Sequence, residues 1–464
     1  MTSRIVITGG EVVTARETLR TAVLIEGESI VALAADESDL VRSFSQSASV
    51  VDATGKYVIP GGIDAHTHLE AGDGTITVPD TFATGTVAAA FGGTTTIIDF
   101  ASPLLGGRVL DGLERYHQKA AGQCAIDYGF HMAIANVDAQ LFPELDELIA
   151  EGVPSFKLFM AYPGQWHSSD DRIFRVMAHA GNTGGLVMMH AENGLIIDDL
   201  RASAIARGDT DPVWHALTRP EAMEAEAVHR STRLAEIAGA PVFIVHLSSA
   251  AAMNEVVHAR ERGTRAFAET CPQYLFLSID DLDRPDFEGS KFVCSPPLRD
   301  RVNHDALWRG LGAGHLDTVA TDHCPYCWTQ KELGRDDFRK IPNGLPGIEH
   351  RIEQMYQGVL AGHMSLNRWV EVCSTAVAET FGLYPRKGTL APGADADVVI
   401  FDPQATRTIT ASEHHMNVDY SVYEGQQLTG RVVQTYLRGR LIVDGDRFLG
   451  AAGQGQFLQR STFS

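Results

Sequence analysis

The order of apolar and polar residues divides the chain into a middle region and two end regions of similar texture. In the first 57 residues, short segments with alternating apolar positions are separated by glycine-rich turns. This pattern is typical of a small antiparallel sheet. The segments lie at residues 4–7, 22–25 and 49–52, and similar ones return at residues 397–401, 432–437 and 440–443. We therefore expect residues 1–57 and 386–464, the latter including a tail, to pair into one β domain.

Residues 58–385 have a different texture, in which short apolar runs alternate with helical stretches. The apolar runs lie at residues 95–100, 155–159, 186–190 and 242–246. Continuous runs of this length are typical of buried parallel strands. Segments between them, such as residues 220–238, carry alanine, glutamate and arginine at helical spacing. The repeated strand–helix unit predicts an α/β fold, a (β/α)8 TIM barrel.

Polar side chains at the ends of the apolar runs are the candidates for chemistry, because barrel strands deliver their last side chains to the catalytic face. His66 and His68 are two residues apart, so in an extended segment they point to the same side and can bind one metal ion. One histidine at a strand end is more often a hydrogen-bonded core residue, but His190 and His246 end two further runs. Four together favour a metal site.

An aspartate completes this set. Asp322 follows the short run at residues 319–321 and supplies an oxygen ligand and a proton carrier. His323 comes next to it, and neighbouring side chains on a strand face opposite ways, so we place His323 outside the metal ligands.

Lys157 lies inside an apolar run, where an unpaired ammonium is costly to bury. A buried salt bridge is one explanation. The other is that desolvation lowers its pKa and leaves a free amine, which adds carbon dioxide to form a carbamate. A carbamate is an anionic oxygen ligand that can bridge two cations.

Composition narrows the class of protein. The net charge of −21 comes from 38 Lys and Arg against 59 Asp and Glu, and the chain has no basic run that could follow a phosphate backbone, so nucleic acid is not an expected partner. The sequence contains no run of about 18 apolar residues, so we expect no membrane association. Its first residues lack the charged segment and following apolar segment of a secretory leader, so we expect a cytoplasmic protein. The six scattered cysteines fit a reducing compartment, and Cys324 and Cys327 lack the second pair that a zinc knuckle needs.

An ordered set of motifs runs through nearly the whole chain. They are His66-Thr67-His68, Lys157-Leu158-Phe159-Met160-Ala161-Tyr162, His190-Ala191-Glu192-Asn193, His246-Leu247-Ser248, the segment 269–275, Ser295-Pro296-Pro297-Leu298-Arg299, Thr321-Asp322-His323-Cys324-Pro325 and, near the end, residues 388–397. In this order the motifs resemble the dihydropyrimidinase and D-hydantoinase branch of the amidohydrolase superfamily. Each motif is weak alone, and the set is specific.

The resemblance implies a TIM barrel with a small β-sandwich domain formed by both chain termini. It also implies two zinc ions per subunit, bridged by N6-carboxylated Lys157, and a homotetramer or homodimer. In this scheme one zinc ion is held by His66, His68 and Asp322, and the other by His190 and His246. Tyr162 would donate a hydrogen bond to the developing oxyanion, and Ser295 and Asn343 would hold the ring of the substrate.

The reaction expected from these parts is the hydrolytic ring opening of a small cyclic amide or ureide. A hydroxide that bridges the two zinc ions would attack the ring carbonyl of a dihydropyrimidine or a 5-substituted hydantoin. Asp322 would accept the proton and return it to the departing ring nitrogen, which yields the N-carbamoyl amino acid. Zinc is the only cofactor that this chemistry needs.

Two loops depart from the family pattern. Hydantoinases of this branch usually carry an apolar Met-Pro-Phe stretch as a lid over the substrate, and the matching residues here are Ala71, Gly72 and Asp73. The smaller lid would lose apolar contact with the substituent of the substrate. After Tyr162, residues 163–167 also differ from the relatives, which often have a lysine there. These changes leave the substrate open.

Four other functions are compatible with this fold. An allantoinase or a cyclic imidase would use the same binuclear mechanism, and nothing in these residues separates them. Dihydroorotases carry an arginine two positions after the second histidine, which binds the substrate carboxylate. This chain has Glu70 there, which we expect to repel that carboxylate, so dihydroorotase activity is not expected. A non-catalytic scaffold similar to the collapsin response mediator proteins would lack the metal ligands, and here all six positions are filled.

Overall fold

A sheet of eight parallel strands forms the centre of the molecule. The structure is a computed structural model that describes residues 3–72, 74 and 76–463. The strands follow each other in chain order and are β8 (Gly62–Thr67), β9 (Thr94–Ala101), β10 (Asp127–Ala133), β11 (Ser155–Phe159), β12 (Leu186–His190), β13 (Val242–Ile244), β14 (Ala266–Thr270) and β15 (Thr318–Val319). The sheet closes between its two edges, where the His68 backbone N–H donates to the His323 carbonyl at 2.9 Å. The predicted TIM barrel is confirmed.

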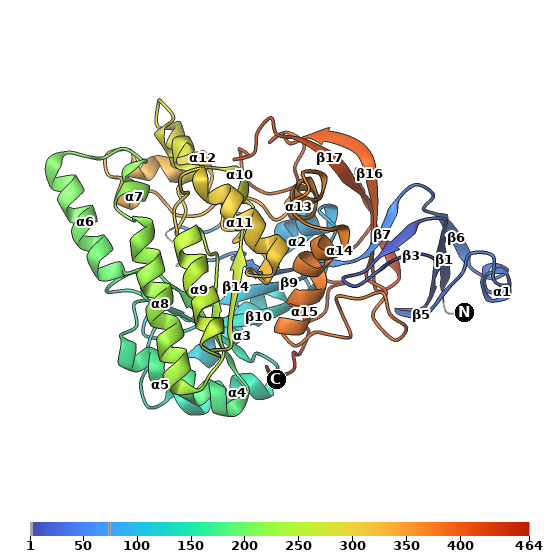
Figure 1. Ribbon diagram of the computed structural model, residues 1–464, viewed down its shortest axis with the longest axis horizontal. Helices are drawn as coiled ribbons and strands as arrows, with labels where there is room; N and C mark the ends of the chain where they lie inside the picture. The colour runs from blue at the N-terminus through green and yellow to red at the C-terminus, as the bar shows by residue number, and fades with distance from the viewer. Residues whose placement is uncertain (1–2, 73, 75, 464) are drawn as a thin grey trace.

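Helices cover the outside of the barrel (Figure 1). The longer ones are α2 (Phe82–Phe91), α3 (Val109–Ala120), α4 (Leu141–Ala150), α5 (Asp170–Thr183), α6 (Gly194–Arg207), α8 (Glu221–Ala238), α9 (Ala250–Glu261), α11 (Val302–Ala313) and α13 (Arg351–Leu360). The helix predicted over residues 220–238 is α8, which begins after Pro220 and ends at Gly239 in the left-handed conformation that glycine adopts at low cost.

Shorter helical segments connect these elements. They are α7 (Trp214–Leu217), α10 (Gln273–Phe276), η1 (Ile279–Asp283), η2 (Glu288–Phe292), α12 (Trp328–Lys331), η3 (Glu332–Gly334), η4 (Phe338–Lys340), α14 (Leu366–Val370), the π-helical turn η5 (Glu371–Thr375) and α15 (Ala376–Thr380). None of the helices in the described part of the chain is both long and apolar enough to cross a membrane.

Apolar side chains fill one end of the barrel interior. The cluster consists of Ile63, Ala65, Ile98, Phe100, Leu186, Met188, Phe243, Val245, Val377, Ala378, Phe381, Leu383 and Leu458. Each large side chain buried there contributes about 1.5–3 kcal/mol. The last residues of the chain take part, because the Leu458 backbone N–H donates to the Tyr128 carbonyl at 2.7 Å. This packing leaves the carboxyl ends of the strands as the open face of the barrel.

Both ends of the chain form the β domain, as predicted. Figure 1 shows the orange β16 and β17 beside the blue β7. One sheet has the order β19 (Arg447–Phe448), β18 (Arg440–Asp444), β17 (Gln427–Leu437), β16 (Val398–Thr408), β7 (Tyr57–Pro60), β2 (Glu11–Val13) and β3 (Thr18–Arg20). The other has the order β5 (Ser29–Ala34), β4 (Ala22–Glu26), β1 (Arg4–Thr8) and β6 (Ser49–Asp52), with α1 (Asp39–Ser45) beside it. Ile7, Val23, Val58 and Ile400 pack between the two sheets.

The expectation of a purely antiparallel sheet near the N-terminus is wrong. β1 pairs with β6 in parallel, and β2 pairs with β7 in parallel. Alternating apolar positions reveal a half-buried strand but not its direction relative to its neighbour. The long connections between these strands allow a parallel arrangement, which a tight hairpin would forbid.

A buried cluster of charges joins the barrel to the β domain. Lys387 Nζ donates to Asp127 Oδ2 at 2.6 Å and to Asp397 Oδ2 at 2.7 Å, and it lies 3.0 Å from Asp395 Oδ2. Asp127 begins β10, whereas Asp397 directly precedes β16. Burial alone would lower the pKa of Lys387, but the charges of the three carboxylates raise it. The ammonium thus holds carboxylates from both domains together.

We expect Lys387→Met to lower the free energy of unfolding by about 3–5 kcal/mol, because it leaves carboxylates buried without their cation. Urea denaturation followed by tryptophan fluorescence measures this. Arg386→Met is the control, since Arg386 is exposed where it pairs with Asp395 at the rim of the cluster, and its loss costs at most about 1 kcal/mol. Equal denaturation midpoints for the two variants would contradict the role given to Lys387.

Candidate metal centre

The carboxyl ends of five barrel strands bring all six predicted metal ligands close together. The residues that lie within strands are His66 in β8, Lys157 in β11 and His190 at the end of β12. His68 follows β8 directly, His246 lies two residues after the end of β13, and Asp322 lies three residues after the end of β15. Side chains that enter from separate strands are held by the barrel itself, so their spacing is fixed by the fold.

His66, His68 and Asp322 form a group that can hold a metal ion. The Nε2 atoms of both histidines lie 3.2 Å from Asp322 Oδ1. In a tetrahedral site with metal–ligand bonds of about 2.0–2.1 Å, neighbouring donor atoms are about 3.3 Å apart. The observed spacing therefore fits one divalent cation.

Lys157 extends this group. Its Nζ lies 3.0 Å from His66 Nε2 and 4.2 Å from the centre of the Phe100 ring, and the side chain is fully buried within the protein. Burial lowers the pKa of Lys157 to about 8, against the opposing charges of Asp322 and Glu269. About one-tenth of the amine is then neutral at pH 7, and the neutral amine is the reactive form of lysine.

His190 and His246 form a second pair beside the first group. His190 Nδ1 lies 2.9 Å from His246 Nε2, and the ring of His246 lies 5.3 Å from the ring of His66. His190 Nε2 donates to Glu192 Oε2 at 2.8 Å, which leaves Nδ1 as the atom that faces His246. Two imidazole nitrogens that converge in this way offer lone pairs to one cation.

Burial favours the neutral form of His66, His68 and His246. It lowers the pKa of His68, and it lowers the pKa of His66 and His246 well below the ordinary value. A neutral imidazole has a free lone pair, whereas a protonated one has none to give. The site is therefore suited to accept cations at neutral pH.

Glu269 orients two of the ligands, and sequence reasoning did not assign it a role. Its Oε1 contacts His66 Nδ1 and accepts a hydrogen bond from the His246 backbone N–H at 3.2 Å. A carboxylate behind a ligating histidine fixes its ring and tautomer. The signal in the sequence was an acidic residue within the apolar run that becomes β14.

Three residues of the site have the left-handed backbone conformation. The φ angles are 60° at Tyr162, 39° at His246 and 50° at Asp322. This conformation costs residues other than glycine about 1–3 kcal/mol each and is concentrated at functional sites. The strain lets each chain segment turn sharply after its strand, so that the side chain is directed into the barrel mouth.

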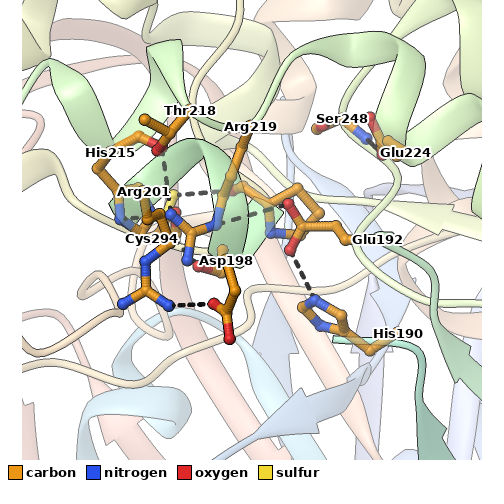
Figure 2. Close-up of polar contacts among 12 residues, drawn as sticks. His190, Glu192, Asp198, Arg201, His215, Thr218, Arg219, Glu224, Ser248 and Cys294 are labelled. Atoms are coloured by element: carbon orange, nitrogen blue, oxygen red, sulfur yellow. Dashed lines mark hydrogen bonds and ion pairs between the residues drawn. The ribbon is translucent and has the colours of Figure 1, made fainter. Parts of the chain in front are cut away.

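A chain of polar contacts lies behind His190 (Figure 2). Glu192, which accepts from His190, has its other oxygen 3.8 Å from Arg219 Nε. Arg219 Nη1 lies 3.0 Å from His215 Nδ1 and donates to the His215 carbonyl at 3.2 Å. His215 Nε2 in turn donates to the Cys294 carbonyl at 2.8 Å. One metal-ligand candidate is thus connected to the segment that carries the predicted substrate contacts.

The predicted substrate residues lie around this site. The ring of Tyr162 is 5.1 Å from that of His190, and the Ser295 hydroxyl lies 3.2 Å from His215 Nε2. Burial raises the pKa of Tyr162, so the phenol stays protonated and able to donate. Asn343 has a buried side-chain oxygen without a hydrogen-bond partner among the described residues. An unpaired buried oxygen of this kind is suited to a ligand N–H.

The predicted lid lies directly after His68. The Ala71 backbone N–H donates to the His68 carbonyl at 3.3 Å, and Gly72 forms a bridge with Thr77. Asp73 lies outside the described residues. Glu70 accepts a hydrogen bond from the Phe82 N–H at the start of α2. Its charge therefore faces a helix rather than the site, so the missing arginine, and not repulsion by Glu70, argues against a dihydroorotase.

His323 is held away from the metal-ligand group. Its Nε2 donates to Asp80 Oδ2 at 3.0 Å, and its Nδ1 accepts from the Gly347 N–H at 3.1 Å. Both ring nitrogens have partners, as expected for a side chain that faces away from Asp322.

Comparisons with known proteins assign this architecture to a family. The model of the amidohydrolase family matches residues 57–442. A D-hydantoinase of Streptomyces coelicolor is 52% identical over 463 residues, which covers 100% of this chain and 99% of the relative. A D-hydantoinase of Geobacillus stearothermophilus is 45% identical and covers 98% of this chain and 96% of its own.

A solved structure agrees with these relatives. The dihydropyrimidinase from Brevibacillus agri superimposes with a TM-score of 0.96 at 46% identity, over 99% of both chains. Because the family model and the relatives cover nearly the whole chain, the protein belongs to the amidohydrolase family.

Proposed function

We propose that this protein is a zinc-dependent hydrolase that opens the ring of a dihydropyrimidine or a 5-substituted hydantoin. The observation that carries the proposal is the convergence of three imidazole or carboxylate ligands with Lys157, whose Nζ lies 3.0 Å from His66. The names of the relatives, D-hydantoinase and dihydropyrimidinase, support the choice of ring. The product would be the N-carbamoyl amino acid.

The arrangement of the donor atoms supports a proposed site for two zinc ions. We infer that His66, His68 and Asp322 hold one ion, that His190 and His246 hold the other, and that N6-carboxylated Lys157 bridges them. When bound, zinc acts as a Lewis acid that lowers the pKa of water and polarises a carbonyl group. The converging His190 and His246 nitrogens, 2.9 Å apart, support the second position.

The environment of Lys157 favours its carboxylation. The neutral amine attacks carbon dioxide, a nitrogen–carbon bond forms, and one proton leaves the nitrogen to give the carbamate anion. A pKa lowered to about 8 by burial keeps neutral amine available near neutral pH. The carbamate would place anionic oxygens beside His66 and offset the buried positive charge of the cations.

Residues of the chain would bind the ring and move the proton. Asp322 accepts the proton of the attacking water and returns it to the departing ring nitrogen. Tyr162, whose hydroxyl stays protonated, donates a hydrogen bond to the oxygen that develops negative charge. Ser295 and Asn343 hold the ring amide or ureide so that its carbonyl faces this group.

Two further functions use the same site. An allantoinase or a cyclic imidase would need the same ligands and the same Tyr162, so only substrate tests separate them. The non-catalytic scaffold has less support, because none of the six proposed ligand positions is lost and the three atoms of His66, His68 and Asp322 have the spacing of a metal site.

We also infer a homotetramer or homodimer in the cytoplasm. Leu195, Ile196 and Leu200 of α6 and Leu217 of α7 are exposed large apolar residues. α6 stands at the edge of the molecule, away from the β domain (Figure 1). A group of exposed apolar side chains supports self-association. The six free thiols support a reducing compartment.

The direct test is ring opening by the zinc-loaded protein on dihydrouracil, hydantoin, both enantiomers of a 5-substituted hydantoin, allantoin and succinimide. We expect turnover of dihydrouracil and hydantoins, and loss of this turnover in Lys157→Ala. Lys56→Ala is the matched control, since Lys56 pairs with Asp402 in the β domain. Turnover of only allantoin or imides would identify the protein as an allantoinase or a cyclic imidase instead. Inactivity on every ring would contradict the proposal.

Glu269→Gln tests the support of the metal ligands. The amide is a weaker acceptor for His66 Nδ1 than the carboxylate, so we expect zinc affinity to fall by about 10- to 100-fold. Competition with a chromophoric chelator measures this affinity. Glu255→Gln, which alters an exposed pair with His229, should leave it unchanged. If both variants keep the affinity of the wild type, Glu269 does not orient the site.

Tyr162→Phe tests the donor to the oxyanion. Removing one such donor should lower kcat by about 10²- to 10³-fold, with zinc content unchanged. Steady-state kinetics and metal analysis on the same preparation measure both. The control is Tyr436→Phe, whose hydroxyl contacts Gln434 in the β domain. Unchanged turnover in Tyr162→Phe would reduce this ring to an aromatic wall of the pocket.

A further inference from the structure

Lys331 is a fully buried lysine at the end of α12, and its ammonium is hydrogen-bonded only through main-chain carbonyls. Its Nζ donates to the carbonyl oxygens of Val293 at 3.0 Å, Pro342 at 2.7 Å and Gly344 at 2.9 Å. An ammonium has three N–H donors, so each donor has one acceptor. Within the described residues, no carboxylate lies within ion-pair distance of Lys331.

The three carbonyls belong to the two segments that carry the proposed substrate contacts. Val293 is two residues before Ser295, and Pro342 and Gly344 are the neighbours of Asn343. The segments also meet directly, because the Gly344 N–H donates to the Val293 carbonyl at 2.9 Å. Lys331 thus joins two stretches of chain that are about fifty residues apart in sequence, on the side where the substrate ring is expected.

Residues 342–344 are packed, on the side away from Lys331, against the loop that carries Asp322. Gly344 has a φ of 148°, and a side chain there would bring its Cβ to 2.0 Å from the Cys324 carbonyl oxygen. Cys324 follows Asp322 by two residues. Residues 342–344 are therefore held between the loop that carries Asp322 and the ammonium of Lys331, with no space to shift toward the loop.

A buried ammonium without a carboxylate is costly, which argues that its position serves a purpose. Burial lowers the pKa of Lys331 to about 7. A methionine would fill the same space at less cost, but it would leave the Pro342 and Gly344 carbonyl oxygens without that donor, while Val293 would keep the Gly344 N–H. The lysine therefore fixes backbone geometry at the expense of stability, a pattern typical of functional sites.

We propose that Lys331 is a positioning residue that sets the spacing of the two backbone segments around the substrate ring, and so sets substrate affinity without touching the substrate. This inference rests on the proposed function, because it uses the ring contacts of Ser295 and Asn343. We expect Lys331 to affect binding more than chemistry, since the metal ligands and Tyr162 are held by β8, β11, β12 and the loops after β13 and β15.

The test compares KM and kcat for hydantoin turnover, together with zinc content, in Lys331→Met and the wild type. We expect KM to rise by about 10-fold or more, because uniform binding of the ring is lost, while kcat and zinc content stay near those of the wild type. Lys340→Met, which removes an exposed lysine on the neighbouring segment, is the matched control and should leave KM unchanged.

Lys331→Gln keeps two N–H donors and serves if Lys331→Met does not fold. It should give a smaller rise in KM than the loss of all three donors. An unchanged KM in either variant, or a parallel fall of kcat and zinc content that indicates a general structural role, would overturn the inference. A wild-type protein that opens none of the rings would instead overturn the proposed function, and the inference would fall with it.

Discussion

The site depends on one constraint, which is that its nitrogen ligands are buried in their uncharged forms. Water is excluded from the side chains of His66, His246 and Lys157, and this desolvation lowers the pKa of each. Neutral imidazoles and a partly neutral amine are the forms that can bind cations or carbon dioxide. The barrel makes this possible because its strands deliver these groups from different directions into one enclosed volume.

Around these ligands, a second set of residues fixes geometry. Glu269 holds His66 and His246, and the chain from Glu192 through Arg219 to His215 connects His190 to the Cys294 segment. The positive φ angles at His246 and Asp322 show that the backbone itself is strained to direct side chains inward. The strained backbone at the site destabilises the fold, and the apolar barrel interior and the ion pairs of Lys387 offset this cost.

The sequence predicted the barrel and the shared β domain, because apolar runs and their spacing depend on local geometry. The same spacing placed His66 and His68 on one side, and the structure brings the other predicted ligands to them. The roles of Glu269 and Lys331 could not be read from spacing, since their partners are more than ten residues away in sequence and are reached only in the folded chain. The parallel pairing of β1 with β6 was not predicted, because alternation shows which face of a strand is buried and not the direction of the neighbouring strand.

Anomalous X-ray diffraction from crystals of the zinc-loaded protein, collected on both sides of the zinc edge, tests the central claim most directly. The account predicts two strong peaks per subunit, one among His66, His68 and Asp322 and one beside His190 and His246, with electron density for a carboxyl group on Lys157 Nζ between them. Absence of both peaks, or zinc bound only at another place such as Cys324 and Cys327, would contradict it.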